Sequence, residues 1–219
     1  MALPIQHDSS GRKPLPEQPL PGGLGLTLLR GRVHEICGPA RVTLAALILG
    51  ASSGPVIWVS PGWLTERVYP PGLRDLADPG RIIFARARRP EDVLWAVEEA
   101  LRSGAAPIVL ADLPAPPALT PVRRLHLACE AGAEAARNRG RTPPLGLLLT
   151  PEDGGAQGVE SRWQMQAAPS GSTLLESHSA WTLRRLRARM TPPAEWRLIS
   201  DPAGGISAAA PVTGPVTGS

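Results

Sequence analysis

Short apolar runs alternate with amphipathic segments through the middle of the chain. Five runs have the aliphatic and β-branched content of buried strands: 32–37 (RVHEIC), 55–60 (PVIWVS), 81–85 (RIIFA), 107–111 (PIVLA) and 145–150 (LGLLLT). Three segments between them have helical spacing of apolar residues: 43–53, 90–103 and 120–138. Strands that alternate with helices predict crossover connections. The pattern therefore predicts an α/β fold with a predominantly parallel, twisted sheet flanked by helices.

The clearest of the three helices begins at Pro90. Glu91 and Asp92 occupy the positively polarised first turn, and Gly104 is placed to end the helix in a left-handed conformation. These signals predict both ends of the helix from local chemistry.

The pattern changes after residue 160. Trp163 and Met165 alternate with glutamines, which is typical of a half-exposed strand. Residues 180–190 and 194–200 predict an antiparallel hairpin at the edge of the sheet. The first of these arms also fits a helix, because Leu183, Leu186 and Met190 would share a helical face.

Both ends of the chain are rich in proline, glycine and small residues. We expect residues 1–23 and 201–219 to be largely disordered, since they offer too little apolar surface to offset the entropy of ordering. The expected domain covers residues 24–200.

Composition excludes several classes of function. The chain has 219 residues and a net charge of +4, and Lys13 is its only lysine among 23 basic Lys and Arg residues. This argues against Schiff-base chemistry and a phosphate-binding lysine. The two cysteines, Cys37 and Cys129, stand in unrelated contexts, and no Cys/His cluster occurs, so we expect no metal and no cofactor. Apolar stretches are too short to span a bilayer, which favours a cytoplasmic protein with no membrane partner.

A strand, a Gly-Pro turn and a helix occupy the place where an α/β domain would carry a phosphate-binding loop. Such a loop has the pattern G-x-x-x-x-G-K-[ST], whereas here only four residues separate Gly38 from Thr43, and the second glycine and the lysine are absent. Asp112 ends a buried strand, at the place of a magnesium-binding aspartate. We interpret Gly38, Thr43 and Asp112 as remnants of a degenerate nucleotide site. The alternative is a connecting turn and an aspartate that caps a neighbouring segment.

These segments resemble RecA recombinases, and more closely the RecA-like ImuA family of inducible-mutagenesis proteins. The stretches that carry the resemblance are GRVHEICGPA (31–40), YPPGL (69–73) and RARRPEDVLWAVEEALRSGA (86–105), within a match over roughly residues 20–200. The resemblance implies a non-replicative accessory factor in DNA-damage tolerance. Its partners would be ImuB, a catalytically dead Y-family polymerase homologue, and an error-prone C-family DNA polymerase. The resemblance to RecA also implies that the strand after the phosphate-loop helix leads to a catalytic glutamate. Here no carboxylate follows that strand until Glu66.

Two arginine clusters are candidates for binding a partner or DNA. Arg86, Arg88 and Arg89 follow the strand at 81–85, where ligands gather in parallel sheets, although Glu91 and Asp92 could pair with them. The second cluster lies on the first arm of the hairpin: Arg184, Arg185, Arg187 and Arg189. As a strand, this arm would align Arg185, Arg187 and Arg189 on one face, either for phosphates or as a solvated outer face. Trp181 and Trp196 flank the hairpin and either pack together or belong to a partner surface.

The leading hypothesis is a non-catalytic adaptor of translesion synthesis. One alternative is a divergent ATPase that uses Arg41, Thr43 and Asp112. A second is a SulA-like inhibitor of cell division. Direct binding of DNA or RecA, and self-association, are compatible with the adaptor hypothesis.

Overall fold

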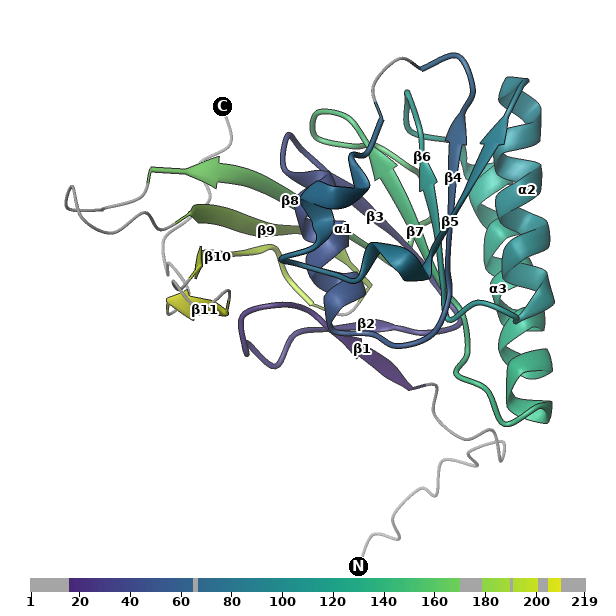
Figure 1. Cartoon of the computed structure of the whole chain (residues 1–219), viewed down its shortest axis with the longest axis horizontal. Coiled ribbons are helices and arrows are strands. Elements are labelled where there is room, and N and C mark those ends of the chain that lie inside the picture. The colour runs from purple at the N-terminus through teal and green to yellow at the C-terminus, as the bar shows by residue number, and fades with distance from the viewer. Residues whose placement is uncertain (1–15, 65–66, 170–178, 190, 201–204, 210–219) are drawn as a thin grey trace, which may run out of the picture.

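The computed structural model describes residues 16–64, 67–169, 179–189, 191–200 and 205–209 (Figure 1). A nine-stranded sheet has the order β11-β10-β9-β8-β3-β7-β6-β4-β5. Its strands are β3 (Val33–Cys37), β4 (Val56–Pro61), β5 (Ile82–Ala87), β6 (Ile108–Asp112), β7 (Leu145–Thr150), β8 (Ser161–Ala168), β9 (Ala180–Ala188), β10 (Ala194–Ser200) and β11 (Ile206–Ala209). Every pairing from β8 to β5 is parallel, and β9, β10 and β11 extend the sheet in antiparallel fashion.

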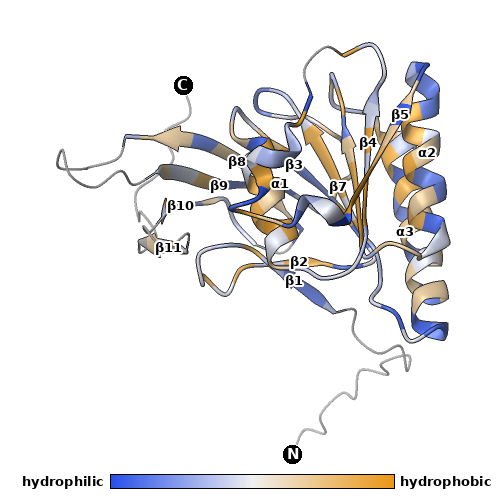
Figure 2. Cartoon of the chain, in the orientation of Figure 1, coloured by the Kyte–Doolittle hydropathy of each residue, from blue (hydrophilic) through white to orange (hydrophobic). Residues whose placement is uncertain are grey.

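Helices cover both faces of the sheet (Figure 1). α1 (Arg41–Gly50) packs on one face, in a core that includes Ile36, Trp58 and Trp163. α2 (Pro90–Ser103) and α3 (Leu119–Asn138) pack side by side on the other face, over Val33, Val109 and Leu148. Figure 2 shows apolar residues concentrated in the central strands and on the sheet-facing sides of the helices. The predicted α/β class and parallel sheet are confirmed.

The local signals around the second helix are also confirmed. Pro90 is the first residue of α2, and Gly104 ends it with φ +60. The ambiguous segment at 180–190 is strand β9 over its described part, and it pairs with β10 as the predicted antiparallel hairpin. Among the described residues, no helix has both the length and the apolarity needed to cross a membrane.

The described structure includes one short strand pairing near each end of the chain. β1 (Glu17–Pro19) pairs with β2 (Thr27–Leu29), and β11 pairs with β10. Both short strands lie within the end segments that we expect to be largely disordered. Pairing satisfies their backbone groups, and Leu20 and Ile206 pack on the core beneath α1.

Candidate functional site

The loop between β3 and α1 packs against β8. It consists of Gly38, Pro39 and Ala40 alone. The Ala40 N–H donates to the Met165 carbonyl at 3.0 Å, and a Cβ added to Gly38 would lie 2.6 Å from the same oxygen. Gly38 has φ +91, so glycine is required here for conformation as well as for space.

A phosphate-binding loop needs converging, unoccupied N–H groups around an open space. In this loop the Ala40 N–H is already bonded to the Met165 carbonyl oxygen, which also lies close against Gly38. A carbonyl oxygen in that position would repel a phosphate. The β3–α1 loop therefore lacks the geometry of a phosphate cradle.

Thr43 and Asp112 do come together, in a pocket of about 300 Å³ beside the start of α1. Arg41 and Arg67 line the same pocket, whereas Gly38 does not. The Nε of Arg41 is buried and has no hydrogen-bond partner among the described residues. The described residues contain no group of three or more His, Cys, Asp or Glu side chains that could hold a metal ion.

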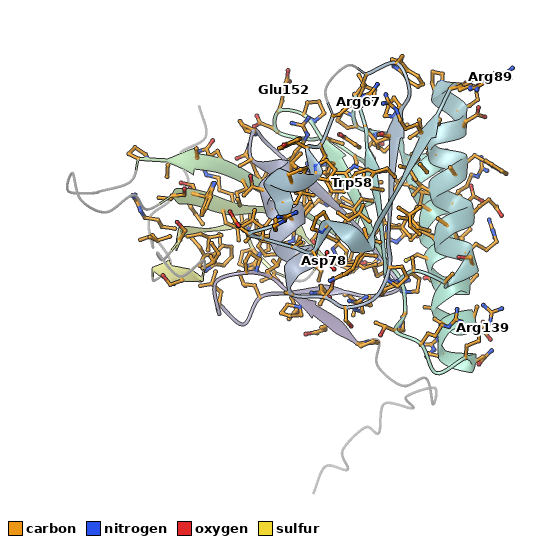
Figure 3. All side chains as sticks on the ribbon, in the orientation of Figure 1. Trp58, Arg67, Asp78, Arg89, Arg139 and Glu152 are labelled. Atoms are coloured by element: carbon orange, nitrogen blue, oxygen red, sulfur yellow. The ribbon has the colours of Figure 1, made fainter. Side chains whose placement is uncertain are left out.

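A second pocket of about 230 Å³ lies next to the first and shares Arg67, Val68 and Asp112 with it. Its wall is aromatic, because Trp58 of β4 and Phe84 of β5 face each other with ring centroids 6.0 Å apart. Figure 3 labels Trp58 and Arg67 in this region. The two pockets join the ends of β4, β5 and β6 into one concave surface that is both cationic and aromatic.

The three arginines after the strand predicted at 81–85 differ in their contacts. Arg86 donates to the carbonyls of Gly62 at 2.8 Å and Leu64 at 3.2 Å, so it fastens the segment that follows β4. Arg88 and Arg89 are exposed, and neither forms an ion pair or hydrogen bond through its side chain within the described part of the chain. In the described part of the chain, neither arginine forms the alternative ion pair with Glu91 or Asp92. Arg88 and Arg89 are therefore available to a partner.

The second arginine cluster is split by a β-bulge. Across the β8–β9 ladder, Arg162 is opposite Arg187 and Trp163 is opposite Arg185, so Leu186 is the extra residue. Residues opposite each other in a ladder share a face. Arg185 thus faces the α1 side with Trp163, whereas Arg187 faces the α3 side with Arg162. The predicted single row of Arg185, Arg187 and Arg189 is wrong, because the bulge reverses the alternation.

Two of these arginines are committed to internal contacts. The Arg185 guanidinium lies 5.6 Å from the centroid of Trp163 and 5.2 Å from that of Trp196, and burial lowers the pKa of Arg185. The Nε of Arg184 donates to Glu195 at 2.6 Å. Trp196 is buried against Trp163 at 5.9 Å, and Trp181 is half-buried against the same core. The hairpin tryptophans therefore have a structural explanation.

Arg189 lies in a different part of the molecule. It lines a pocket of about 590 Å³ with Arg32, Arg123 and His126, beside Glu130 and Glu160. Arg32 already pairs with Glu130 and lies 3.8 Å from Glu160, so it engages both carboxylates of this pocket. This pocket is not continuous with the surface at β4, β5 and β6.

Sequence reasoning missed a buried ionic network around Glu35 of β3. Glu35 is fully buried and accepts hydrogen bonds from Thr150 Oγ1 at 2.7 Å, from the amides of Gly155 and Ala156, and from Arg162 Nε at 2.5 Å. The network joins β3, β7, β8 and the loop between the last two. A lone carboxylate inside the apolar run RVHEIC is the signal that could have revealed it.

His34, the neighbour of Glu35, belongs to a second buried chain of hydrogen bonds. Trp163 Nε1–H donates to Ser161 Oγ at 2.8 Å, and Ser161 Oγ lies 2.7 Å from His34 Nδ1. His34 Nε2 is 3.0 Å from the Leu29 carbonyl, which assigns the proton to Nε2. Burial lowers the pKa of His34 to about 4, so this histidine is neutral and structural.

Neither cysteine lines any of these three pockets. Cys37 and Cys129 are both buried and free, and burial raises the pKa of each thiol to about 12. A thiol with so high a pKa is a poor nucleophile.

No protein-family model matches the chain, and no curated protein matches its sequence.

Proposed function

We propose that this chain is a non-catalytic, RecA-like accessory protein of DNA-damage-induced mutagenesis. It would act as an adaptor that binds an ImuB-like Y-family polymerase homologue and an error-prone C-family DNA polymerase. The resemblance of residues 31–40, 69–73 and 86–105 to the ImuA family suggests these partners. The α/β fold is compatible with that family.

The observation that carries the non-catalytic part of the proposal is the closed β3–α1 loop. The Met165 carbonyl lies close against Gly38 and accepts a hydrogen bond from the Ala40 N–H. Without a phosphate cradle or a lysine, Thr43 and Asp112 have no phosphate-bound magnesium to hold. This argues against the divergent-ATPase alternative.

The side chains that remain available for binding on the surface favour a protein partner over DNA. Arg184 and Arg185 are held by Glu195 and by two tryptophans, and Arg187 and Arg189 are not aligned with Arg185. A continuous row of guanidinium groups to follow a phosphate backbone is therefore missing from the described residues. Large apolar side chains are exposed instead: Trp63, Tyr69, Ile83, Phe84, Trp95 and Leu127.

The direct test is binding to the ImuB-like protein encoded in the same genome. The purified chain and the ImuB-like protein should form a complex at physiological salt. Mg-ATP titrated into the free chain by calorimetry should give no saturable heat. Absence of the complex would refute the adaptor role, whereas micromolar Mg-ATP binding that disappears in Thr43→Ala would favour the ATPase alternative.

A further inference from the structure

Strand β5 ends the parallel side of the sheet with an open edge. It pairs with β4 on one side, and no described strand pairs with its other side. An open edge of this kind can accept an additional strand through its backbone groups.

The register identifies the backbone groups that face outward. The Ala87 carbonyl accepts the Gly62 N–H on the β4 side. Peptide groups alternate in direction along a strand, so those of Ile83 and Ala85 also face β4. Those of Phe84 and Arg86 face outward, and each offers one N–H and one C=O to a neighbouring strand.

The side chains on this edge are apolar and exposed. Ile83 is 59% exposed and Phe84 is 42% exposed. They project to opposite faces of the sheet, because they are consecutive residues of one strand. Edge strands usually carry charges or are very short, as β11 is at the other end of the sheet. The run from Ile82 to Ala85 is uncharged, whereas Arg86, Arg88 and Arg89 at the end of β5 oppose pairing with another basic edge.

A preformed pocket lies beside this edge. Phe84 and Trp58 form the aromatic wall of the 230 Å³ pocket, and Pro70 and Val68 add apolar surface. A side chain from an added strand that projects to the same face as Phe84 would meet this wall. The pocket is large enough for one apolar or aromatic side chain.

The charge around the edge selects an acidic occupant. Of the four arginines between residues 81 and 89, Arg81 and Arg86 donate to backbone carbonyls of neighbouring segments. Arg88 and Arg89 are exposed and have no side-chain partner among the described residues. Arg89 lies at the start of α2, at the end of the helical layer opposite Arg139 (Figure 3). Two positive charges without a partner at the end of β5 favour a negatively charged segment.

We propose that the open edge of β5 is a docking site for an extended, acidic segment of a partner protein, which adds to the sheet as a further strand. Its apolar or aromatic anchor occupies the pocket beside Phe84, and flanking carboxylates contact Arg88 and Arg89. The proposal deepens the adaptor function and rests on it, since it supplies the surface through which the adaptor binds.

A second copy of this chain is the less favourable occupant. Two β5 edges in contact would place Arg88 and Arg89 of both copies, none with a carboxylate partner, along one short interface. Like charges at such an interface oppose association, whereas an acidic segment is attracted.

Amide hydrogen exchange on the whole chain tests strand addition directly. The probe is a synthetic peptide with acidic ends and an apolar centre, Asp-Glu-Val-Phe-Val-Asp-Glu, and the control peptide has arginine in place of each acidic residue. Binding should slow exchange at Phe84 and Arg86 by about tenfold, because their N–H groups become bonded. Exchange at Ala85 should not change, since its N–H already faces β4. Equal slowing at all three positions, or none, would overturn the proposal.

Variants separate the backbone contribution from the side-chain and charge contributions. Phe84→Ala removes the aromatic wall, and Phe84→Pro also removes the outward N–H. We expect Phe84→Pro to bind the acidic peptide about tenfold more weakly than Phe84→Ala. Arg89→Glu should weaken binding by about fivefold at low salt, whereas Arg139→Glu makes the same change in net charge and should have no effect. If Phe84→Pro fails to fold, the exchange experiment on the unmodified chain still decides the question.

The outcomes distinguish this proposal from the function on which it rests. If the chain binds the ImuB-like protein but neither Phe84→Pro nor Arg89→Glu weakens that complex, the docking edge is wrong and the adaptor role stands. If the chain binds the acidic peptide at β5 but not the ImuB-like protein, the docking edge stands and the proposed partner is wrong. Dimerisation of the free chain that Phe84→Pro abolishes would assign the edge to a second copy and refute the proposal.

Discussion

Replacing Glu35 with alanine should destabilise the protein severely. The substitution leaves the Arg162 guanidinium without its buried carboxylate, and it also leaves Thr150 Oγ1 and the amides of Gly155 and Ala156 without an acceptor. The Arg162 side chain is only 18% exposed, so water can replace little of what is lost. Removing one partner of a buried, hydrogen-bonded ion pair costs about 3–5 kcal/mol. We therefore expect Glu35→Ala to lower the free energy of unfolding by about 4 kcal/mol, a large part of a typical total of roughly 5–15 kcal/mol.

A partly exposed ion pair provides the control for this prediction. Glu130 pairs with Arg32, and its side chain is 39% exposed, so Glu130→Ala should cost less than about 1 kcal/mol. Urea unfolding followed by tryptophan fluorescence measures both variants, because Trp58 and Trp163 are buried in the core.

Two results would refute this reasoning about Glu35. The first is a loss below about 1 kcal/mol for Glu35→Ala, since that would mean that the buried donors find other partners. The second concerns the double variant Glu35→Ala with Arg162→Met, which removes both charges. It should cost about 1–2 kcal/mol less than the sum of the single variants. Strict additivity would show that the two side chains do not act as a pair.

Three further predictions concern stability and DNA binding. Because burial holds the pKa of His34 at about 4, the unfolded chain binds a proton between about pH 6.5 and pH 4 that the folded chain does not. Stability should therefore fall as the pH falls through this window, by about 2 kcal/mol between pH 7 and pH 5, and His34→Gln should flatten the dependence in urea unfolding. Gly38→Ala should cost about 2 kcal/mol or more, because it combines a left-handed φ with a close approach to Met165. Gly140 also has a left-handed φ, +64, but open space surrounds it, so Gly140→Ala should cost only about 1 kcal/mol. Equal losses of stability for the two variants in thermal unfolding would argue against the close approach at Gly38. Arg185→Ala should lower the free energy of unfolding by about 1 kcal/mol, because the variant loses the contacts of Arg185 with two tryptophans. It should leave any salt-dependent affinity for DNA unchanged. A weaker affinity for DNA, measured by fluorescence polarisation, would identify Arg185 as a DNA contact.

The parallel sheet and its helices were predictable from sequence because their signals are local. Each central strand is an uninterrupted apolar run, and α2 carries Pro90 at its start and Gly104 at its end. These features depend on neighbouring residues and on burial, which periodicity reports directly.

The parts that were not predictable depend on contacts between distant segments. The bulge at Leu186 arises from the register between β8 and β9, so the alternation of arginines in the sequence gave the wrong face for Arg187. Closure of the β3–α1 loop depends on Met165, which is more than a hundred residues away along the chain. The partners of Glu35 lie in three later segments. Sequence spacing carries no information about such pairings until the topology is known.

The central claim is that this protein works by binding a partner protein and not by binding or hydrolysing a nucleotide. The affinity of the chain for the ImuB-like protein, measured by calorimetry at physiological salt with and without Mg-ATP, tests both halves together. The account predicts a complex whose dissociation constant is the same in the two conditions. Absence of a complex, or an affinity that changes when Mg-ATP is added and no longer changes in Thr43→Ala, would contradict it.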